Sequence, residues 1–185
     1  LDVFDNFYAN LYDDITFNNS KNNFEIKEIM ELTDLNSSSK VLDIGSGTGH
    51  HVALLAEKNI PVIGLDTSQA MIDYSKKTYP NLNFNLGNSL NSGLYPANSF
   101  THIQCLYYTL YYIKDKEKFF NNCMKWVMPG GYLIIHLVDK NKFNPIMPNG
   151  MIDFKKTLNN SNKYTKTIME VKNLSYTSDF MEYSI

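Results

Sequence analysis

Short apolar runs recur along the chain, with amphipathic segments between most of them. The runs occupy residues 41–44, 61–65, 82–86, 100–106 and 132–138. Several are bounded by Gly, Pro, Asn or Asp, which is typical of strands. Helical spacing of apolar residues occurs at 50–58, 69–77 and 116–127. Strands alternating with helices favour right-handed βαβ units, so we predict an α/β fold with a doubly wound, mainly parallel sheet and helices on both faces. The stretch 88–99 is short and polar, so at most a stunted helix is expected there.

The N-terminal segment has a different pattern. A helix that packs on the sheet edge is predicted from four residues at helical spacing, Ile26, Ile29, Met30 and Thr33. The polar run 16–23 predicts a loop before this helix. Ahead of that run lies an aromatic stretch with Phe4, Phe7, Tyr8 and Tyr12.

The last third of the chain differs again. Residues 141–150 contain two prolines and a glycine and predict a loop. Residues 163–176 are rich in Thr, Ile, Val and Tyr, a strand composition with no helix after it.

Composition excludes several classes of protein. The 17 basic residues are all Lys, and the net charge of −2 with no basic cluster argues against a nucleic-acid surface. No apolar run is long enough to span a membrane, and no secretory signal is visible. Cys105 and Cys123 cannot form a disulfide framework or a four-ligand zinc site. We therefore expect a cytoplasmic protein without a bound metal, and its oligomeric state stays open.

The strongest chemical signal is the segment Val-Leu-Asp-Ile-Gly-Ser-Gly-Thr-Gly at 41–49, in which a strand runs into a three-glycine loop and then a helix. Glycines allow positive φ and close backbone approach to a ligand, and a helix N-terminus offers free N–H groups. Asp66 ends the second predicted strand. In a doubly wound sheet this carboxylate lies beside the glycine loop and can accept two ribose hydroxyls. The pair predicts a nucleoside-binding site.

The spacing discriminates between nucleoside ligands. A dinucleotide fingerprint places its third glycine at position 50, which is His50, whereas this chain has Gly49. Asp43, two residues before the loop, disfavours a pyrophosphate and suits a ligand with an ammonium group. This combination resembles motif I of the class I S-adenosylmethionine-dependent methyltransferases, which implies the Rossmann-like methyltransferase fold with S-adenosyl-L-methionine as cofactor.

The resemblance extends from about residue 8 to 138. Leu-Asp-Thr-Ser-Gln-Ala-Met-Ile at 65–72 is similar to the family's second motif, which implies that Asp66 binds ribose while Thr67 and Met71 flank adenine. Gly-Asn-Ser at 87–89 resembles the loop after the third strand, with Asn88 in place of the usual Asp at the adenine amino group. Met-Pro-Gly-Gly at 128–131 resembles the turn before the fifth strand, and Thr101 departs from a frequent Asp. The aromatic front segment resembles the lid of small-molecule members.

The cofactor-side residues that the resemblance implies form one set: Asp43, Gly45, Ser46, Gly47, Gly49, Asp66, Thr67, Met71, Asn88, Ser89 and Cys105. The sulfonium donor is already activated, so a general base is needed only when the acceptor arrives protonated. No catalytic residue is therefore fixed by the sequence, and the candidates are Tyr107, His136 and Tyr12. Packing under a loop for Tyr107, and a buried structural role for His136, stand beside these functional interpretations.

Residues 1–138 are thus predicted to form the S-adenosylmethionine-binding domain, with an N-terminal helical lid. Residues 139–185 are either a substrate-side β-rich insertion or the terminal hairpin of the same domain. We favour the insertion, with the sheet's last strands absent; a seven-stranded sheet with the family's reversed final pair would exclude it.

The leading hypothesis is a methyltransferase that moves a methyl group to a small molecule by in-line displacement. The alternatives are a nicotinamide-dependent oxidoreductase and a non-catalytic S-adenosylmethionine-binding module. Because no Arg is available to hold a phosphate or carboxylate, a neutral or cationic acceptor is favoured.

Overall fold

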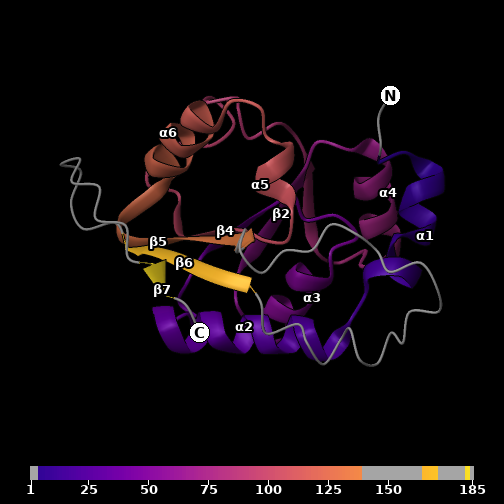
Figure 1. The fold of residues 1–185 in the computed structure, drawn as a ribbon, viewed down its shortest axis with the longest axis horizontal. Helices are drawn as coiled ribbons and strands as arrows, with labels where there is room; N and C mark the ends of the chain where they lie inside the picture. Colours follow the sequence, from indigo (N-terminus) through magenta and orange to yellow (C-terminus); the bar gives the residue numbers. More distant parts are fainter. Residues whose placement is uncertain (1–3, 139–163, 171–181, 184–185) are drawn as a thin grey trace.

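A computed structural model describes residues 4–138, 164–170 and 182–183. Its helices and strands alternate as the sequence predicts for residues 41–138 (Figure 1). In chain order the elements are α1 (Asn6–Thr16), α2 (Asn19–Thr33), β1 (Val41–Ile44), α3 (His50–Glu57), β2 (Val62–Asp66), α4 (Gln69–Thr78), β3 (Asn83–Leu86), β4 (Phe100–Cys105), α5 (Thr109–Tyr112), α6 (Lys116–Trp126), β5 (Val127–Val138), β6 (Tyr164–Glu170) and β7 (Glu182–Tyr183).

The strands form one sheet in the order β3-β2-β1-β4-β5-β6-β7. The first five are parallel, so the predicted doubly wound, mainly parallel sheet is confirmed. β6 pairs antiparallel with β5, and β7 pairs antiparallel with β6. These two strands follow β5 in chain order, without the reversal that would exclude an insertion. The assignment of residues 139–185 as insertion or terminal hairpin stays a prediction, and the predicted loop at 141–150 lies outside the described residues.

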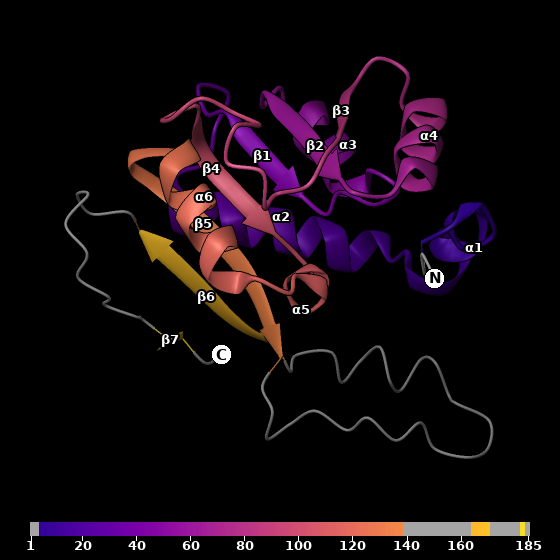
Figure 2. The ribbon, with the colours of Figure 1, turned by 90° about the horizontal axis from the view of Figure 1, so that it is seen from above.

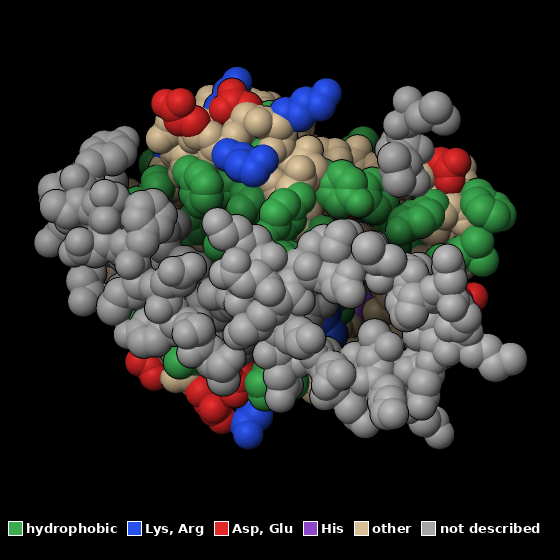
Figure 3. Space-filling model, viewed as in Figure 1, with side chains coloured by type: hydrophobic (Ala, Val, Ile, Leu, Met, Phe, Trp, Pro, Cys, Tyr) green, Lys and Arg blue, Asp and Glu red, His purple; other side chains and the backbone are tan. Residues whose placement is uncertain are grey.

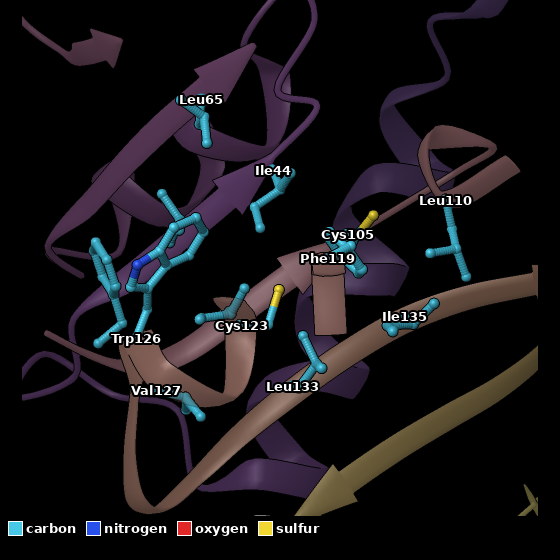
Figure 4. Packing of buried hydrophobic residues seen from close by; sticks show 13 residues of the cluster. Ile44, Leu65, Cys105, Leu110, Phe119, Cys123, Trp126, Val127, Leu133 and Ile135 are labelled. Carbon is cyan, nitrogen blue, oxygen red and sulfur yellow. The ribbon is translucent and has the colours of Figure 1, made fainter. Parts of the chain in front are cut away.

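Two apolar cores lie on the two faces of the sheet. One packs α6 against β4 and β5 through Phe119, Cys123 and Trp126, which are fully buried (Figure 4). The other packs α2 and α3 through Ile26 and Val52. Figures 1 and 2 show α5 and α6 on one side of the sheet and α2 and α3 on the other. Helices on both faces leave the C-terminal ends of the parallel strands as the place for a ligand.

The segment before β1 corrects one prediction. Residues 16–23 were expected to form a loop, but α1 runs to Thr16 and α2 begins at Asn19, so only Phe17 and Asn18 connect them. The Asn18 side chain accepts a hydrogen bond from the backbone N–H of Lys21 at 2.9 Å and caps α2. A polar, Asn-rich run therefore forms the capped first turn of a helix, because Asn is among the preferred N-cap residues.

Strand β5 is irregular at 128–131, where the sequence predicted a turn. The pairing of β4 with β5 jumps from Phe100 opposite Val127 to His102 opposite Tyr132. Gly130 has φ +79°, and a Cβ on Gly131 would lie 2.5 Å from the carbonyl oxygen of Thr101. Glycine is thus required where the strand re-enters the sheet. The stretch 88–99 contains no helix. Among the described helices, none has the length and apolar character that crossing a bilayer requires.

Candidate functional site

The loop between β1 and α3 is held by its three glycines. Gly45, Gly47 and Gly49 have φ of +75°, +52° and +92°, a region that side chains other than Gly rarely adopt. A Cβ on Gly45 would run into the Thr109 side chain of α5. A Cβ on Gly49 would lie 2.7 Å from the Phe84 ring. The loop therefore packs closely on β3 and α5, with its backbone N–H groups at the strand ends.

Asp66, the last residue of β2, fastens this loop. Its Oδ2 accepts a hydrogen bond from the Gly47 N–H at 2.9 Å, and its Oδ1 accepts one from the Ser68 N–H at 2.9 Å. Each carboxylate oxygen can accept more than one hydrogen bond. The carboxylate thus lies beside the glycine loop, as the strand order requires.

A cavity of about 740 Å³ opens at this edge of the sheet. Its volume is in the range of small-molecule sites, about 300–1,000 Å³. The sequence-derived candidates that line it are Gly45, Gly47, Asp66, Thr67, Met71, Asn88, Ser89, Tyr12 and Tyr107. Those that do not line it are Asp43, Ser46, Gly49, Cys105 and His136.

Asp43 and Cys105 lie beneath the site. Asp43 is 3% exposed, and burial raises the pKa of its carboxyl group. Cys105 is fully buried in the core shared with Leu110 and Phe119 (Figure 4). Burial raises the pKa of its thiol far above the usual value, so the sulfur is an apolar packing atom and not a nucleophile.

Asn88 follows β3 at the edge of the cavity. Its side-chain oxygen accepts a hydrogen bond from the Leu90 N–H at 2.9 Å. This turn fixes the orientation of the Asn88 side chain, which stands where the methyltransferase motif after the third strand usually has Asp. Ser89 is buried next to it, and its carbonyl oxygen accepts a hydrogen bond from the Asn122 amide at 2.8 Å.

Helix α1 is attached to the glycine-loop region through Asp13. Its Oδ1 accepts a hydrogen bond from Thr48 Oγ1 at 2.7 Å, and its Oδ2 lies 2.9 Å from His50 Nε2 and accepts one from the Tyr74 hydroxyl at 3.2 Å. The neighbouring Tyr12 faces the cavity. α1 thus forms part of the cavity wall, at the place where the lid was predicted. Phe7 and Ile15 of this helix are exposed, and Figure 3 shows hydrophobic side chains at the surface over α1.

The loop after β4 forms the opposite wall of the cavity, and Tyr107 is its fixed point. Tyr107 has φ +53°, a strained value for an aromatic residue. Its hydroxyl donates to Asn22 Oδ1 at 2.7 Å, and its backbone N–H donates to His136 Nδ1 at 3.2 Å. The Lys21 ammonium lies 3.2 Å from the centre of its ring. His136 therefore holds the backbone of this loop from below, without lining the cavity.

Glu25 of α2 joins these groups into one buried cluster. Its carboxylate lies 3.2 Å from Lys21 Nζ, 3.0 Å from His51 Nε2 and 3.8 Å from His136 Nδ1. The residue is 4% exposed. The cluster connects α2, α3 and β5 beneath the Tyr107 loop.

Sequence reasoning missed several residues that line the cavity. They are Thr16, Asn18, Lys21, Tyr112 and Lys114, whereas Phe4 and Tyr8 belong to the predicted aromatic front segment. Lys21 was missed because its segment was predicted to be a loop; the four-residue spacing between Lys21 and Glu25 was the available signal for a helix.

Comparisons with known proteins agree with this geometry. Residues 35–182 match the family model described as a methyltransferase domain. The chain is 34% identical over 113 residues to phosphoethanolamine N-methyltransferase 1 of Arabidopsis thaliana, covering 59% of this chain and 23% of that protein. It is 31% identical over 113 residues to phosphoethanolamine N-methyltransferase of Plasmodium falciparum, covering 59% and 42%. The chain spans less than half of either relative's length.

Solved structures show the same fold. A putative S-adenosyl-L-methionine-dependent methyltransferase from Methanococcus maripaludis superposes with a TM-score of 0.62 at 21% identity, over 73% of this chain and 64% of that one. A putative sarcosine dimethylglycine methyltransferase from Galdieria sulphuraria superposes with a TM-score of 0.57 at 19% identity, over 66% and 50%.

Proposed function

The chain belongs to the methyltransferase domain family, as a class I domain that uses S-adenosylmethionine, and from this premise we propose that the protein transfers a methyl group to a small-molecule amine. The main support for this proposal is that one cavity is lined at the same time by the glycine loop with Asp66 and by several tyrosines, here called the tyrosine wall. One chamber can thus hold the methyl donor and the acceptor side by side. The two phosphoethanolamine N-methyltransferases support an amine as the acceptor. The family match favours the methyltransferase over the nicotinamide-dependent alternative.

The residues at the glycine-loop end fit the cofactor. Gly45 and Gly47 bring the backbone close to the cavity, and the Asp66 carboxylate can accept ribose hydroxyls beside its two backbone partners. Met71 offers an apolar surface for adenine, and the side-chain oxygen of Asn88 can accept a hydrogen bond from the adenine amino group. Asp43 is buried in β1 just before the loop and Gly49 ends the loop, so neither residue lines the cavity.

The tyrosine wall fits a small amine. Among the described cavity-lining residues, aromatic rings come from α1, from the loop after β4 and from α5, with Tyr8, Tyr12, Tyr107 and Tyr112 among them. The faces of such rings attract an ammonium or a methyl group with partial positive charge. They also exclude water from the line of transfer.

S-adenosylmethionine, when bound, would supply an activated methyl group on a sulfonium: the acceptor nitrogen lone pair would form the new carbon–nitrogen bond, and the electron pair of the carbon–sulfur bond would stay on sulfur. The protein's part is to align the acceptor and exclude water. Burial raises the pKa of Tyr12, so this hydroxyl stays protonated and does not serve as a base. The Tyr107 hydroxyl is engaged with Asn22. The amine therefore reacts in its neutral form and loses its proton to water after transfer.

Binding of S-adenosylhomocysteine tests the cofactor assignment. Calorimetry of the intact chain should show micromolar binding, and Asp66→Ala should weaken it about 10- to 100-fold, because a charged hydrogen-bond acceptor is lost. The control is Asp73→Ala on the exposed side of α4, where the carboxylate accepts from Gln69. A folded wild-type chain that does not bind S-adenosylhomocysteine would contradict the proposal.

Turnover tests the transfer itself. Release of S-adenosylhomocysteine should be detected with at least one small amine of a panel that includes ethanolamine, phosphoethanolamine and glycine. Binding of S-adenosylhomocysteine without turnover of any amine would instead support the non-catalytic module.

A further inference from the structure

The charged side chains of the cavity are distributed unevenly. Among the described residues that line it, three carry charge: Asp66, Lys21 and Lys114. Asp66 belongs to the glycine-loop end, where it accepts hydrogen bonds from Gly47 and Ser68. Lys21 and Lys114 belong to the other end, which α2 and the segment after α5 form. The described lining of the acceptor end is thus positive.

Lys21 is built into this wall and is not a mobile surface lysine. Its side chain is 19% exposed, and its ammonium packs over the Tyr107 ring at 3.2 Å from the ring centre. Burial lowers the pKa of this ammonium, while Glu25 opposes the shift. A lysine on a flexible stem is here fixed in one place by an aromatic face and a carboxylate.

The carboxylate that balances Lys21 is shared. Glu25 Oε1 lies 3.2 Å from Lys21 Nζ and 3.8 Å from His136 Nδ1, and its Oε2 lies 3.0 Å from His51 Nε2. Among the described contacts, the Glu25 carboxylate thus lies close to three basic side chains. An anion entering the cavity next to Lys21 would meet an ammonium that is largely shielded from water, where electrostatic attraction is stronger than at the surface.

We infer that Lys21 receives an anionic group of the acceptor, so that the substrate class is an amine carrying a phosphate or a carboxylate. This inference rests on the proposed function. It revises the preference for a neutral or cationic acceptor drawn from the lack of Arg, because Lys binds phosphate and carboxylate as a point charge without a guanidinium fork.

Three amines test which anionic group, if any, the acceptor carries. Phosphoethanolamine has a phosphate, glycine has a carboxylate, and ethanolamine has no anionic group. The wild-type chain should use phosphoethanolamine or glycine with a kcat/KM at least about tenfold above that for ethanolamine. The preferred one of the two identifies the anion. Lys21→Gln should raise KM for the preferred anionic amine about 10- to 100-fold, and by a clearly smaller factor for ethanolamine.

The same helix offers a matched control. Lys27 and Glu31 form an i,i+4 pair at 3.6 Å, like Lys21 and Glu25, but their side chains are 71% and 59% exposed. Lys27→Gln should change none of the three kinetic profiles. Lys21→Arg, which keeps the charge, should retain the preference for the anionic amine. Thermal unfolding and S-adenosylhomocysteine binding of each variant show that its fold and cofactor site are intact.

Calorimetry of phosphoethanolamine and glycine with the S-adenosylhomocysteine-loaded protein gives a readout apart from turnover. Binding of one of them that Lys21→Gln weakens supports the inference, even where no amine is turned over and the proposed function fails. Ethanolamine used as well as both anionic amines, an equal loss for all three in Lys21→Gln, or no binding of either anionic amine would overturn it.

Discussion

At position 49, both the backbone conformation and the close packing require a glycine. It precedes α3 with φ +92°, and a Cβ there would lie 2.7 Å from the Phe84 ring and 3.2 Å from Ser75 Cβ. A side chain would thus be strained in the backbone and would also push β3 and α4 away from the loop. The glycine therefore fixes the start of α3 close to β3 and α4.

Gly49→Ala is therefore expected to lower the free energy of unfolding by about 1–3 kcal/mol. Urea unfolding followed by circular dichroism measures this change. Gly93→Ala is the matched control, because its nearest neighbour is Asn91 Oδ1 at 3.5 Å and its φ is not positive. The control should stay within about 0.5 kcal/mol of the wild-type chain. Equal stability of the two variants would contradict the packing argument.

Individual residues differ in how far the sequence can identify them. The glycine loop and Asp66 are predictable, because strand order alone brings the ends of β1 and β2 together. Lys21 and Glu25 are not, because their role depends on where α2 crosses the ends of β4 and β5. The position of Cys105 at the end of a strand suggested a cavity contact, but strand alternation turns its side chain into the core.

At the scale of elements, α1 is held by polar contacts and only a small buried apolar area. Ala9 is its buried residue, whereas Phe7 and Ile15 are 74% and 63% exposed. Asp13 therefore provides much of the attachment, through Thr48, His50 and Tyr74. An element held in this way opens more easily than the sheet.

Asp13→Ala should release α1 while leaving the sheet intact. Hydrogen exchange of the α1 amides is expected to accelerate about 10- to 100-fold, because hydrogen bonds to a charged group are lost. The amides of β1 and β4 should exchange at the wild-type rate. Asp14→Ala, one residue on and exposed, should change neither. Uniform acceleration across the sheet in Asp13→Ala would show that α1 does not open separately.

Elements with strong periodicity were predicted well. β1 and the helices α3, α4 and α6 match their predicted ranges within a residue or two. A buried parallel strand appears in the sequence as a continuous apolar run, and an amphipathic helix appears as apolar residues at helical spacing. α5 was not predicted, because four residues in an aromatic loop carry no periodicity. The start of α2 was wrong because Asn favours both loops and N-caps.

At the scale of the whole molecule, Glu25 makes stability depend on pH. Burial alone would raise the pKa of Glu25, but the hydrogen bond from His51 and the electrostatic interactions with His136 and Lys21 outweigh it and lower the pKa. A carboxyl group that is more acidic in the folded state stabilises the fold above its unfolded pKa. That contribution is lost as the pH falls through the folded pKa.

Glu25→Gln should lower the free energy of unfolding at pH 5.5 by about 1–3 kcal/mol, because an acceptor for a buried cationic cluster loses its charge. The difference from the wild-type chain should shrink at pH 3.5, because the unfolded Glu25 binds a proton below its ordinary pKa of about 4.3 and the ionised carboxylate then contributes less to the stability of the fold. Urea titrations at the two pH values measure it. Glu31→Gln, in the exposed pair, should cost at most about 1 kcal/mol at pH 5.5. If the difference in free energy of unfolding between Glu25→Gln and the wild-type chain became larger at pH 3.5, the lowered pKa of Glu25 would be contradicted.

The contact between Gly45 and Thr109 limits how this fold can be re-engineered. The glycine leaves room for the Thr109 side chain, so the start of α5 packs directly on the glycine loop. Changing acceptor preference by grafting a different segment at 107–114 must therefore keep a small residue at position 109. A bulkier one would transmit a change made for the acceptor into the loop that shapes the donor site.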